Sequence, residues 1–205
     1  GVSVTDDCFG TPTLTVDTSR VDVSTAGTYP VVYRAVDGAG NATEQTAVVT
    51  VYPFEVSEDM LWARVDALLS ELLSPEDTKE QICRRVHAYV KENIAYCGTS
   101  DKSDRVRAAY MALFVEGMGD CYSYCAAAWA LLTRAGIECL EIQRSPFEVG
   151  NAHYWLLVDI SATGEAERWY HLDATVLLDD GAPDGCLLTD AQIDAYSRMS
   201  PGFYV

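Results

Sequence analysis

Basic residues are scarce in this chain. Of its 205 residues, 14 are Lys or Arg and 31 are Asp or Glu, which gives a formal net charge of -17 at pH 7. No stretch of the sequence gathers enough basic residues to override this negative charge. Because nucleic acids and anionic membranes bind proteins through positive charge, this balance argues against either one as a partner.

Long hydrophobic runs are also missing. Although 49% of the residues are apolar, no apolar run reaches the roughly 20 residues that a membrane-spanning helix needs. We therefore expect a soluble globular protein that does not insert into a membrane. The length allows one large domain or two small ones, and it says nothing about the oligomeric state.

The seven cysteines lack the spacing of a metal site. No Cys-x-x-Cys pair occurs, and Cys121 and Cys125, one helical turn apart, have no second pair of ligands to complete a zinc site. We therefore expect no metal and no cofactor, and we expect Cys125 to pack beneath the helix that carries both. An odd number of cysteines leaves at least one thiol unpaired, which suits a reactive cysteine. The other six allow up to three disulfides or none.

Residues 1–52 differ in composition from the rest of the chain. They are rich in Thr, Val and Asp and contain a single Leu. Apolar and polar residues alternate over 13–16, 29–36 and 47–51, with turn signals between these stretches. The pattern predicts a small all-β module of antiparallel strands. Tyr52-Pro53-Phe54 is typical of a short linker, so we place a second domain at residues 53–205.

Helical patterns fill the first half of the second domain. Ser57 is a good N-cap for a helix that runs to about Leu73, and Ser74-Pro75 signals the start of the next helix. His87 lies on this second helix among basic residues, so we expect it on an exposed face. Further helices are expected over about 104–115 and from 121 to near Gly136.

Strand patterns follow the helices. They cover 137–144, 152–160 and 167–173, and a short helix is expected over about 189–198. Helices followed by strands indicate an α+β domain. We expect its antiparallel sheet to pack on the helix that begins at Cys121.

Three residues in chain order have the chemistry of a cysteine acyl-transfer site. Cys121 lies at the first turn of the expected helix, where the helix dipole favours the thiolate over the thiol. His153 opens one strand and Asp173 closes another, so two adjacent strands can hold an imidazole beside a carboxylate. This arrangement predicts Cys121 as nucleophile, His153 as base and acid, and Asp173 as the carboxylate that orients the imidazole.

Other assignments stay open at this point. His171 shares a strand face with Asp173 and is the competing candidate for the base. The backbone N–H of Cys121 is available to stabilise an oxyanion, and Tyr96 is a weak candidate for the second donor. Trp155 is equally consistent with a substrate wall and with the core.

These residues resemble a known family. Gly119-Asp120-Cys121 before an apolar helix, His153-x-Trp155, and Trp169-Tyr170-His171-x-Asp173 are similar to the motifs of the transglutaminase-like superfamily. The resemblance covers roughly residues 55–205. It implies a papain-related fold with a Cys, His, Asp triad at Cys121, His153 and Asp173. Residues 27–41 resemble part of a bacterial surface immunoglobulin-like repeat, whose first strand we expect this module to lack.

The resemblance implies an enzyme of the cell surface. We expect a secreted or surface-anchored bacterial cysteine acyltransferase or peptidase, with an immunoglobulin-like module ahead of its catalytic domain. Its substrate would be a protein or peptide, with cell-wall peptides among the candidates. The thioester would be resolved by water, as in a peptidase or amidase, or by an amine, as in a transglutaminase. The alternative is a catalytically inactive member of the superfamily that serves binding or adhesion.

Overall fold

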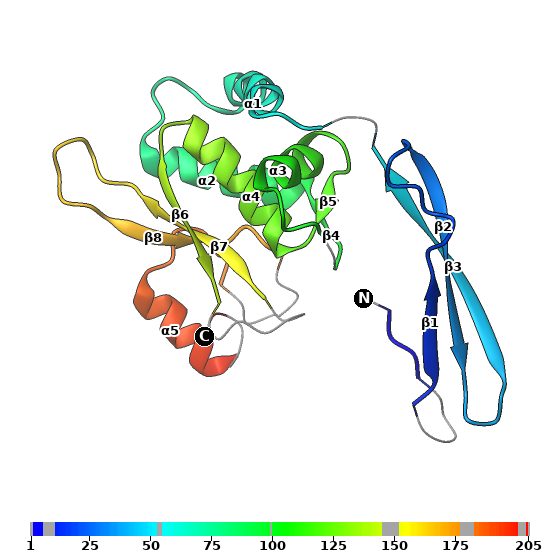
Figure 1. The fold of residues 1–205 in the computed structure, drawn as a ribbon. Coiled ribbons are helices and arrows are strands. Elements are labelled where there is room, and N and C mark those ends of the chain that lie inside the picture. The colour runs from blue at the N-terminus through cyan, green and yellow to red at the C-terminus, as the bar shows by residue number, and fades with distance from the viewer. Residues whose placement is uncertain are drawn as a thin grey trace. The chain divides into compact units, whose positions relative to one another are not determined.

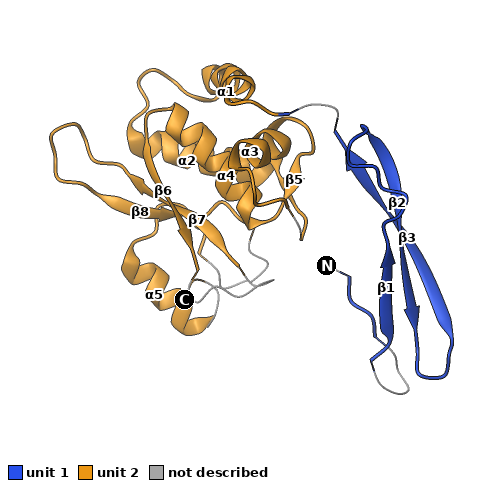
Figure 2. Cartoon of the chain, viewed as in Figure 1, with its two compact units in different colours: residues 1–55 blue, residues 56–205 orange. Residues whose placement is uncertain are grey.

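The chain divides into two compact units in the computed structural model. The first is Gly1–Glu55 and the second is Val56–Val205 (Figures 1 and 2). The structure describes residues 2–5, 11–52, 55–98, 100–144, 152–176, 183–200 and 204. The predicted linker residues Pro53 and Phe54 and the cysteine Cys8 lie outside these ranges.

The first unit contains a three-stranded antiparallel sheet. Its strands are β1 (Thr13–Asp17), β2 (Gly27–Val36) and β3 (Ala42–Val51), in the order β1-β2-β3. The three alternating stretches of the sequence fall within these strands, as predicted.

The predicted turn between β2 and β3 is confirmed. The Asp37 carboxylate accepts hydrogen bonds from the backbone N–H groups of Ala39 and Asn41, and Gly40 adopts a positive φ of 90°. Within the described part of this unit, Val31 is the one buried apolar side chain. An immunoglobulin fold packs two sheets face to face. The likeness to an immunoglobulin-like repeat therefore stays a prediction.

The second unit begins with helices that match most of the predicted starts. Ser57 caps α1 by accepting a hydrogen bond from the Met60 N–H, and Asp104 caps α3 through the Arg107 N–H. None of the described helices is long and apolar enough to cross a membrane. The helices are α1 (Glu58–Leu72), α2 (Lys79–Asn93), α3 (Arg105–Phe114), α4 (Cys121–Arg134) and α5 (Asp190–Met199).

The predicted start of α2 at Ser74 is wrong. The helix begins at Lys79, where Thr78 and Gln81 form a capping box. The Ser74 N–H instead donates to the Asp77 carboxylate, and the Asp77 N–H donates back to the Ser74 carbonyl at 3.0 Å. The cap, proline and acid of this segment are thus used in a tight turn, and the capping box four residues later starts the helix.

A three-stranded antiparallel sheet follows the helices, in the order β6-β7-β8. Helix α4 contacts β6 and β7 as well as α1, α2 and α3, so it lies at the centre of the unit (Figure 1). Eleven of its fourteen residues are buried, and Ala126, Ala130 and Leu131 are fully enclosed. The sheet strands are β6 (Glu138–Gln143), β7 (Tyr154–Asp159) and β8 (Trp169–Leu172).

One short pairing was not predicted from the sequence. The two-residue strands β4 (Ala95–Tyr96) and β5 (Met118–Gly119) pair in parallel, which ties the end of α2 to the segment just before α4. Two residues are too few for a periodic pattern, so the sequence gives no signal for this pairing.

We expect residues 56–205 to fold without the first unit. Apart from Val31, every buried apolar residue of the described chain lies in the second unit. A protein lacking residues 1–55 should therefore keep one cooperative thermal transition, with a midpoint within a few degrees of that of the full chain. Calorimetry of the two proteins measures this. Loss of the cooperative transition on removal of residues 1–55 would show that the two units fold as one.

Candidate active site

Cys121 is the first residue of α4, as predicted. Asp120 is the N-cap, and its carboxylate accepts hydrogen bonds from the backbone N–H groups of Tyr122 at 3.0 Å and Ser123 at 3.4 Å. The turn into the helix requires glycine at position 119, because a Cβ there would lie 2.2 Å from the Ser123 Cβ. The thiol is therefore held at the N-terminal end of a buried helix.

The Asp120 carboxylate has two further partners from the segment before α3. Ser100 Oγ donates to Oδ1 at 2.6 Å, and Lys102 Nζ donates to Oδ2 at 2.7 Å. Burial alone would raise the pKa of Asp120, but the hydrogen bonds from Lys102 and Ser100 outweigh burial and lower it. Asp120 is therefore an ionised cap.

His153 and Asp173 lie at the same end of the sheet. His153 directly precedes β7 and Asp173 directly follows β8, and the antiparallel register pairs Leu156 with Leu172. The His153 Nε2 lies 2.7 Å from the Asp173 Oδ2, and both side chains are buried. The backbone of His153 is held as well, because the Arg144 N–H donates to its carbonyl at 2.9 Å.

The structure brings Cys121 to this pair. Cys121 is among the groups that raise the pKa of His153, and its Sγ lies 3.5 Å from the carbonyl oxygen of Ala152, the residue before His153. Since Nε2 of His153 faces Asp173, Nδ1 is the ring nitrogen left for the thiol. Burial alone would lower the pKa of His153, but the hydrogen bonds to Asp173 and Cys121 outweigh burial and raise it to about 9.

Both carboxylate oxygens of Asp173 accept hydrogen bonds. Besides His153, the Tyr204 hydroxyl donates to Oδ2 at 3.1 Å and the Thr175 N–H donates to Oδ1 at 3.0 Å. Burial alone would raise the pKa of Asp173, but the interactions with His153 and Thr175 outweigh burial and lower it. A buried carboxylate can stay ionised when its oxygens are satisfied in this way.

The Asp173 backbone is fixed from two other segments. Its N–H donates to the Gly185 carbonyl at 2.8 Å, and its carbonyl accepts from the His87 Nε2 at 3.1 Å. Gly185 has a φ of 85°, and a Cβ there would lie 2.1 Å from the Asp173 carbonyl oxygen. This position therefore requires glycine both for its backbone conformation and for the space beside Asp173.

The expectation that His87 lies on an exposed face is wrong. Its side chain is buried on α2, where desolvation lowers its pKa and the hydrogen bond to Asp173 opposes that shift. The spacing of Cys83, His87 and Lys91 at four-residue intervals puts all three on one stripe of the helix. Lys91 also reaches this region, since its Nζ lies 2.6 Å from the Asp184 carboxylate. That spacing was the available signal for a buried His87.

Two aromatic side chains pack against the His153 ring. Trp155 is buried and its ring stacks on the His153 ring with centroids 5.5 Å apart, while Tyr204 contacts both rings. Trp155 is thus part of the core. The role of Tyr204 had no signal in the sequence, because a tyrosine near the end of the chain follows no motif.

His171 has partners other than the thiol. Its Nδ1 accepts a hydrogen bond from the Trp155 indole N–H at 2.8 Å, and its Nε2 lies 3.0 Å from the Asp190 carboxylate. Both ring nitrogens of His171 therefore have hydrogen-bond partners, one on β7 and one on α5. The geometry favours His153 over His171 as the neighbour of Cys121.

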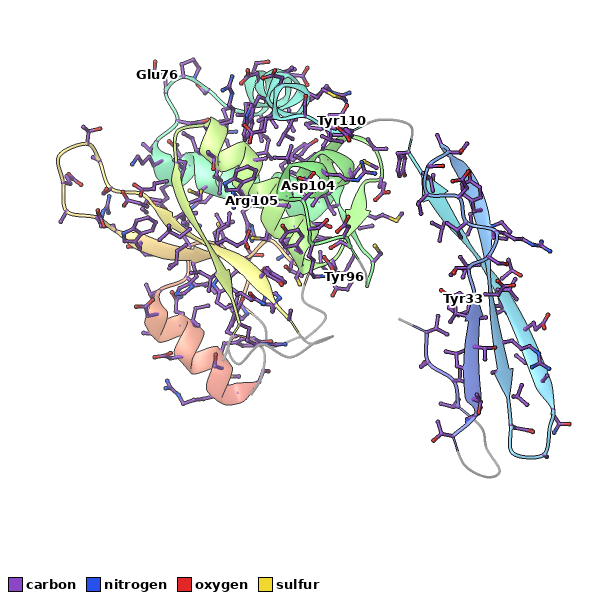
Figure 3. The ribbon with its side chains drawn as sticks, viewed as in Figure 1. Tyr33, Glu76, Tyr96, Asp104, Arg105 and Tyr110 are labelled. Atoms are coloured by element: carbon purple, nitrogen blue, oxygen red, sulfur yellow. The ribbon has the colours of Figure 1, made fainter. Side chains whose placement is uncertain are left out.

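Tyr96 and Cys125 complete the surroundings of the thiol. Tyr96 lies on β4 (Figure 3). About half of its surface is exposed, and its pKa is raised by burial and by the nearby Cys121. Its role as an oxyanion donor stays a prediction. Cys125 is buried one turn below Cys121, as expected. Across the described ranges, no group of three His, Cys, Asp or Glu side chains is arranged to hold a metal ion.

Gly185 provides a stability test of the Asp173 environment. We expect Gly185→Ala to lower the free energy of unfolding by about 3 kcal/mol, because the Cβ adds a clash with Asp173 to the cost of a positive φ. The matched control is Gly164→Ala, since Gly164 has a φ of 86° with nothing within 4 Å of its Cβ. That substitution should cost about 1 kcal/mol. Equal losses in urea unfolding would contradict the steric role of Gly185.

The raised pKa of His153 predicts a pH dependence of stability. Because the folded value of about 9 exceeds the ordinary value of 6.5, His153 stabilises the fold fully below pH 6.5 and loses this contribution as the pH rises through 9. Between these pH values the unfolding free energy of the wild type should fall further than that of His153→Gln, by on the order of 2 kcal/mol. Urea unfolding at several pH values measures both, and parallel curves would contradict the assignment.

Comparison with known proteins agrees with the geometry of this domain. The profile of the transglutaminase-like superfamily matches residues 66–174, over half of the chain, and this range contains Cys121, His153 and Asp173. A search of curated proteins finds no significant match. The chain belongs to the transglutaminase-like superfamily.

Proposed function

We propose that this protein is a cysteine acyl-transfer enzyme that forms a thioester on Cys121. The observation that carries the proposal is the hydrogen bond between His153 and Asp173, with Cys121 at the start of α4 interacting with the same imidazole. A nucleophile, a base and an orienting acid in this order are the parts that covalent acyl transfer needs. Membership in a superfamily of generally cysteine-dependent acyltransferases and peptidases supports the same class.

The first half of the reaction uses these three residues in turn. His153 takes the thiol proton of Cys121, and the sulfur attacks the carbonyl carbon of a peptide or carboxamide. The resulting imidazolium then gives its proton to the departing amine as the C–N bond breaks. Asp173 accepts from Nε2 throughout, which keeps Nδ1 facing the sulfur and stabilises the imidazolium.

The oxyanion is assigned to the start of α4. As the first residue of the helix, Cys121 has a backbone N–H without a partner four residues earlier in the helix. This N–H lies at the positive end of the helix dipole, so it can donate a hydrogen bond to an oxygen that becomes negatively charged during the reaction. We assign the second donor to Tyr96, whose position on β4 next to Gly119 brings it near the thiol.

Water is the proposed acceptor of the thioester. An amine acceptor enters as a cation and needs a carboxylate to bind it, but Asp120 already accepts from four donors. Lys102 also places a positive charge beside the thiol, which repels a protonated amine. These charges favour a peptidase or amidase over a transglutaminase.

The substrate and the setting are also proposals. We assign a protein or peptide substrate, with bacterial cell-wall peptides as the first class to test, and a secreted or surface location. The first unit would then be an immunoglobulin-like spacer that carries the catalytic domain.

Acyl transfer can be tested directly. In one reaction the protein is incubated with a glutamine-containing protein and a labelled primary amine, and in another with short cell-wall peptides. We expect peptide cleavage without amine incorporation, and a loss of roughly 10³-fold or more in Cys121→Ala. The matched control is Cys139→Ala, which removes a thiol from β6 and should leave the rate unchanged.

The other outcomes separate the alternatives. Amine incorporation that depends on Cys121 would identify a transglutaminase. If the wild type neither cleaves peptides nor incorporates amine, and Cys121 also resists alkylation at neutral pH, the enzyme proposal fails. An inactive member of the superfamily that binds peptides would then take its place.

A further inference from the structure

Lys102 is a basic residue that, like His153, interacts electrostatically with the Cys121 thiol. It lies in the segment between β4 and α3, its Nζ donates to the Asp120 Oδ2 at 2.7 Å, and about a third of its side chain is exposed. Burial alone would lower the pKa of Lys102, but Asp120 and Cys121 outweigh burial and raise it. Lys102 therefore interacts with both the helix cap and the nucleophile.

The charges that face Cys121 at neutral pH are few. Burial raises the pKa of Tyr96 and Tyr154, and it raises the pKa of Cys125 well above the ordinary value of 9.0, so these three groups are neutral. Among the residues that the structure describes, the charged groups that interact with Cys121 are His153, whose partner is Asp173, and Lys102, whose partner is Asp120.

The Asp120 carboxylate places a negative charge next to Cys121. The carboxylate is buried, belongs to the residue before Cys121, and accepts the N–H groups that would otherwise present positive charge at the helix start. A negative charge this close disfavours a thiolate. The helix cap alone would therefore cancel much of the dipole effect that favours the nucleophile.

We propose that Lys102 is a positioning residue that neutralises Asp120 and so keeps the Cys121 thiolate accessible at neutral pH. This inference rests on the proposed function, because it assigns Lys102 a task in the same site. Ser100 shares the structural part of this task by donating to the other oxygen of Asp120, but it carries no charge. A salt bridge at the first turn of α4 thus lets one carboxylate cap the helix without suppressing the nucleophile.

Binding of a substrate carboxylate is the rival role for Lys102. Its ammonium is already within hydrogen-bond distance of Asp120, so a substrate anion would have to compete with a buried charge. The rival also predicts a different result, since a substrate contact changes the KM and leaves the ionisation of the free thiol unaffected.

The pH dependence of alkylation tests the proposal on the full chain. Iodoacetamide is added at a series of pH values, and the rate at Cys121 is followed by mass mapping. In Lys102→Met, which keeps the alkyl stem and removes the charge, we expect the midpoint of the rate against pH to rise by about one unit. The rate at pH values below the midpoint then falls about tenfold. Lys102→Arg keeps the charge and should restore the wild-type profile.

Two controls isolate the effect of position. Lys79→Met removes one positive charge from another lysine with a third of its side chain exposed, which pairs with Asp159 at the far end of β7. It should leave the midpoint unchanged. In Lys102→Met/Asp120→Asn both charges are absent and asparagine still caps the helix, so the midpoint should return toward that of the wild type. If Lys102→Met does not fold, the test is instead the comparison of the midpoint in this double variant with the midpoint in Asp120→Asn alone.

The outcomes distinguish this proposal from the proposed function. A Cys121 that does not react even in the wild type overturns the enzyme proposal. A reactive wild type with an unshifted midpoint in Lys102→Met, with or without a raised KM, overturns the role of Lys102 alone. A shift of equal size in Lys79→Met would assign the effect to net charge and would overturn it as well.

Discussion

The buried carboxylate of Asp173 is the constraint on which the second unit depends. An ionised carboxyl group inside a protein costs several kcal/mol unless hydrogen bonds satisfy its oxygens. Here the donors come from separate parts of the chain, namely His153 before β7, Tyr204 near the C-terminus, and the backbone of Thr175. Segments distant in sequence must therefore assemble before the charge is stable, which couples the site to the fold.

The backbone of Asp173 extends this dependence to α2 and to the segment before α5. His87 donates to the Asp173 carbonyl, and Gly185 accepts from its N–H. His87 must stay neutral in its buried position, because desolvation lowers its pKa. The interactions of His87 with Asp173 oppose this lowering without cancelling it. The fold holds the carboxylate, and the carboxylate in turn fixes the direction of the imidazole.

Sequence reasoning located the residues that belong to local patterns. The N-cap Ser57, the start of α3 near Asp104, the start of α4 at Cys121 and the strands of the sheet that follows all agree with spacing and residue type. The positions of His153 and Asp173 at strand ends followed in the same way. The catalytic roles of these residues stay predictions.

Contacts between distant segments could not be predicted from sequence patterns. The partners Tyr204 and Gly185 depend on how the C-terminal part of the chain returns to the sheet, which no periodicity encodes. His87 was assigned to the wrong face because the basic residues beside it outweighed its four-residue spacing from Cys83. The start of α2 was misplaced because the same residue types serve a helix cap and a tight turn, and a stronger capping box lay four residues later.

Cys121 and Cys125 show how environment separates identical side chains one turn apart. Cys125 is enclosed within the core, where desolvation raises its pKa well above 9.0 and keeps it a neutral thiol. Burial likewise raises the pKa of Cys83 and Cys139 to about 12 and that of Cys186 to about 11. Cys121 is also largely buried, but an imidazole and an ammonium group face it. The nucleophile role proposed for Cys121 rests on these two neighbouring groups and on its place at the helix start.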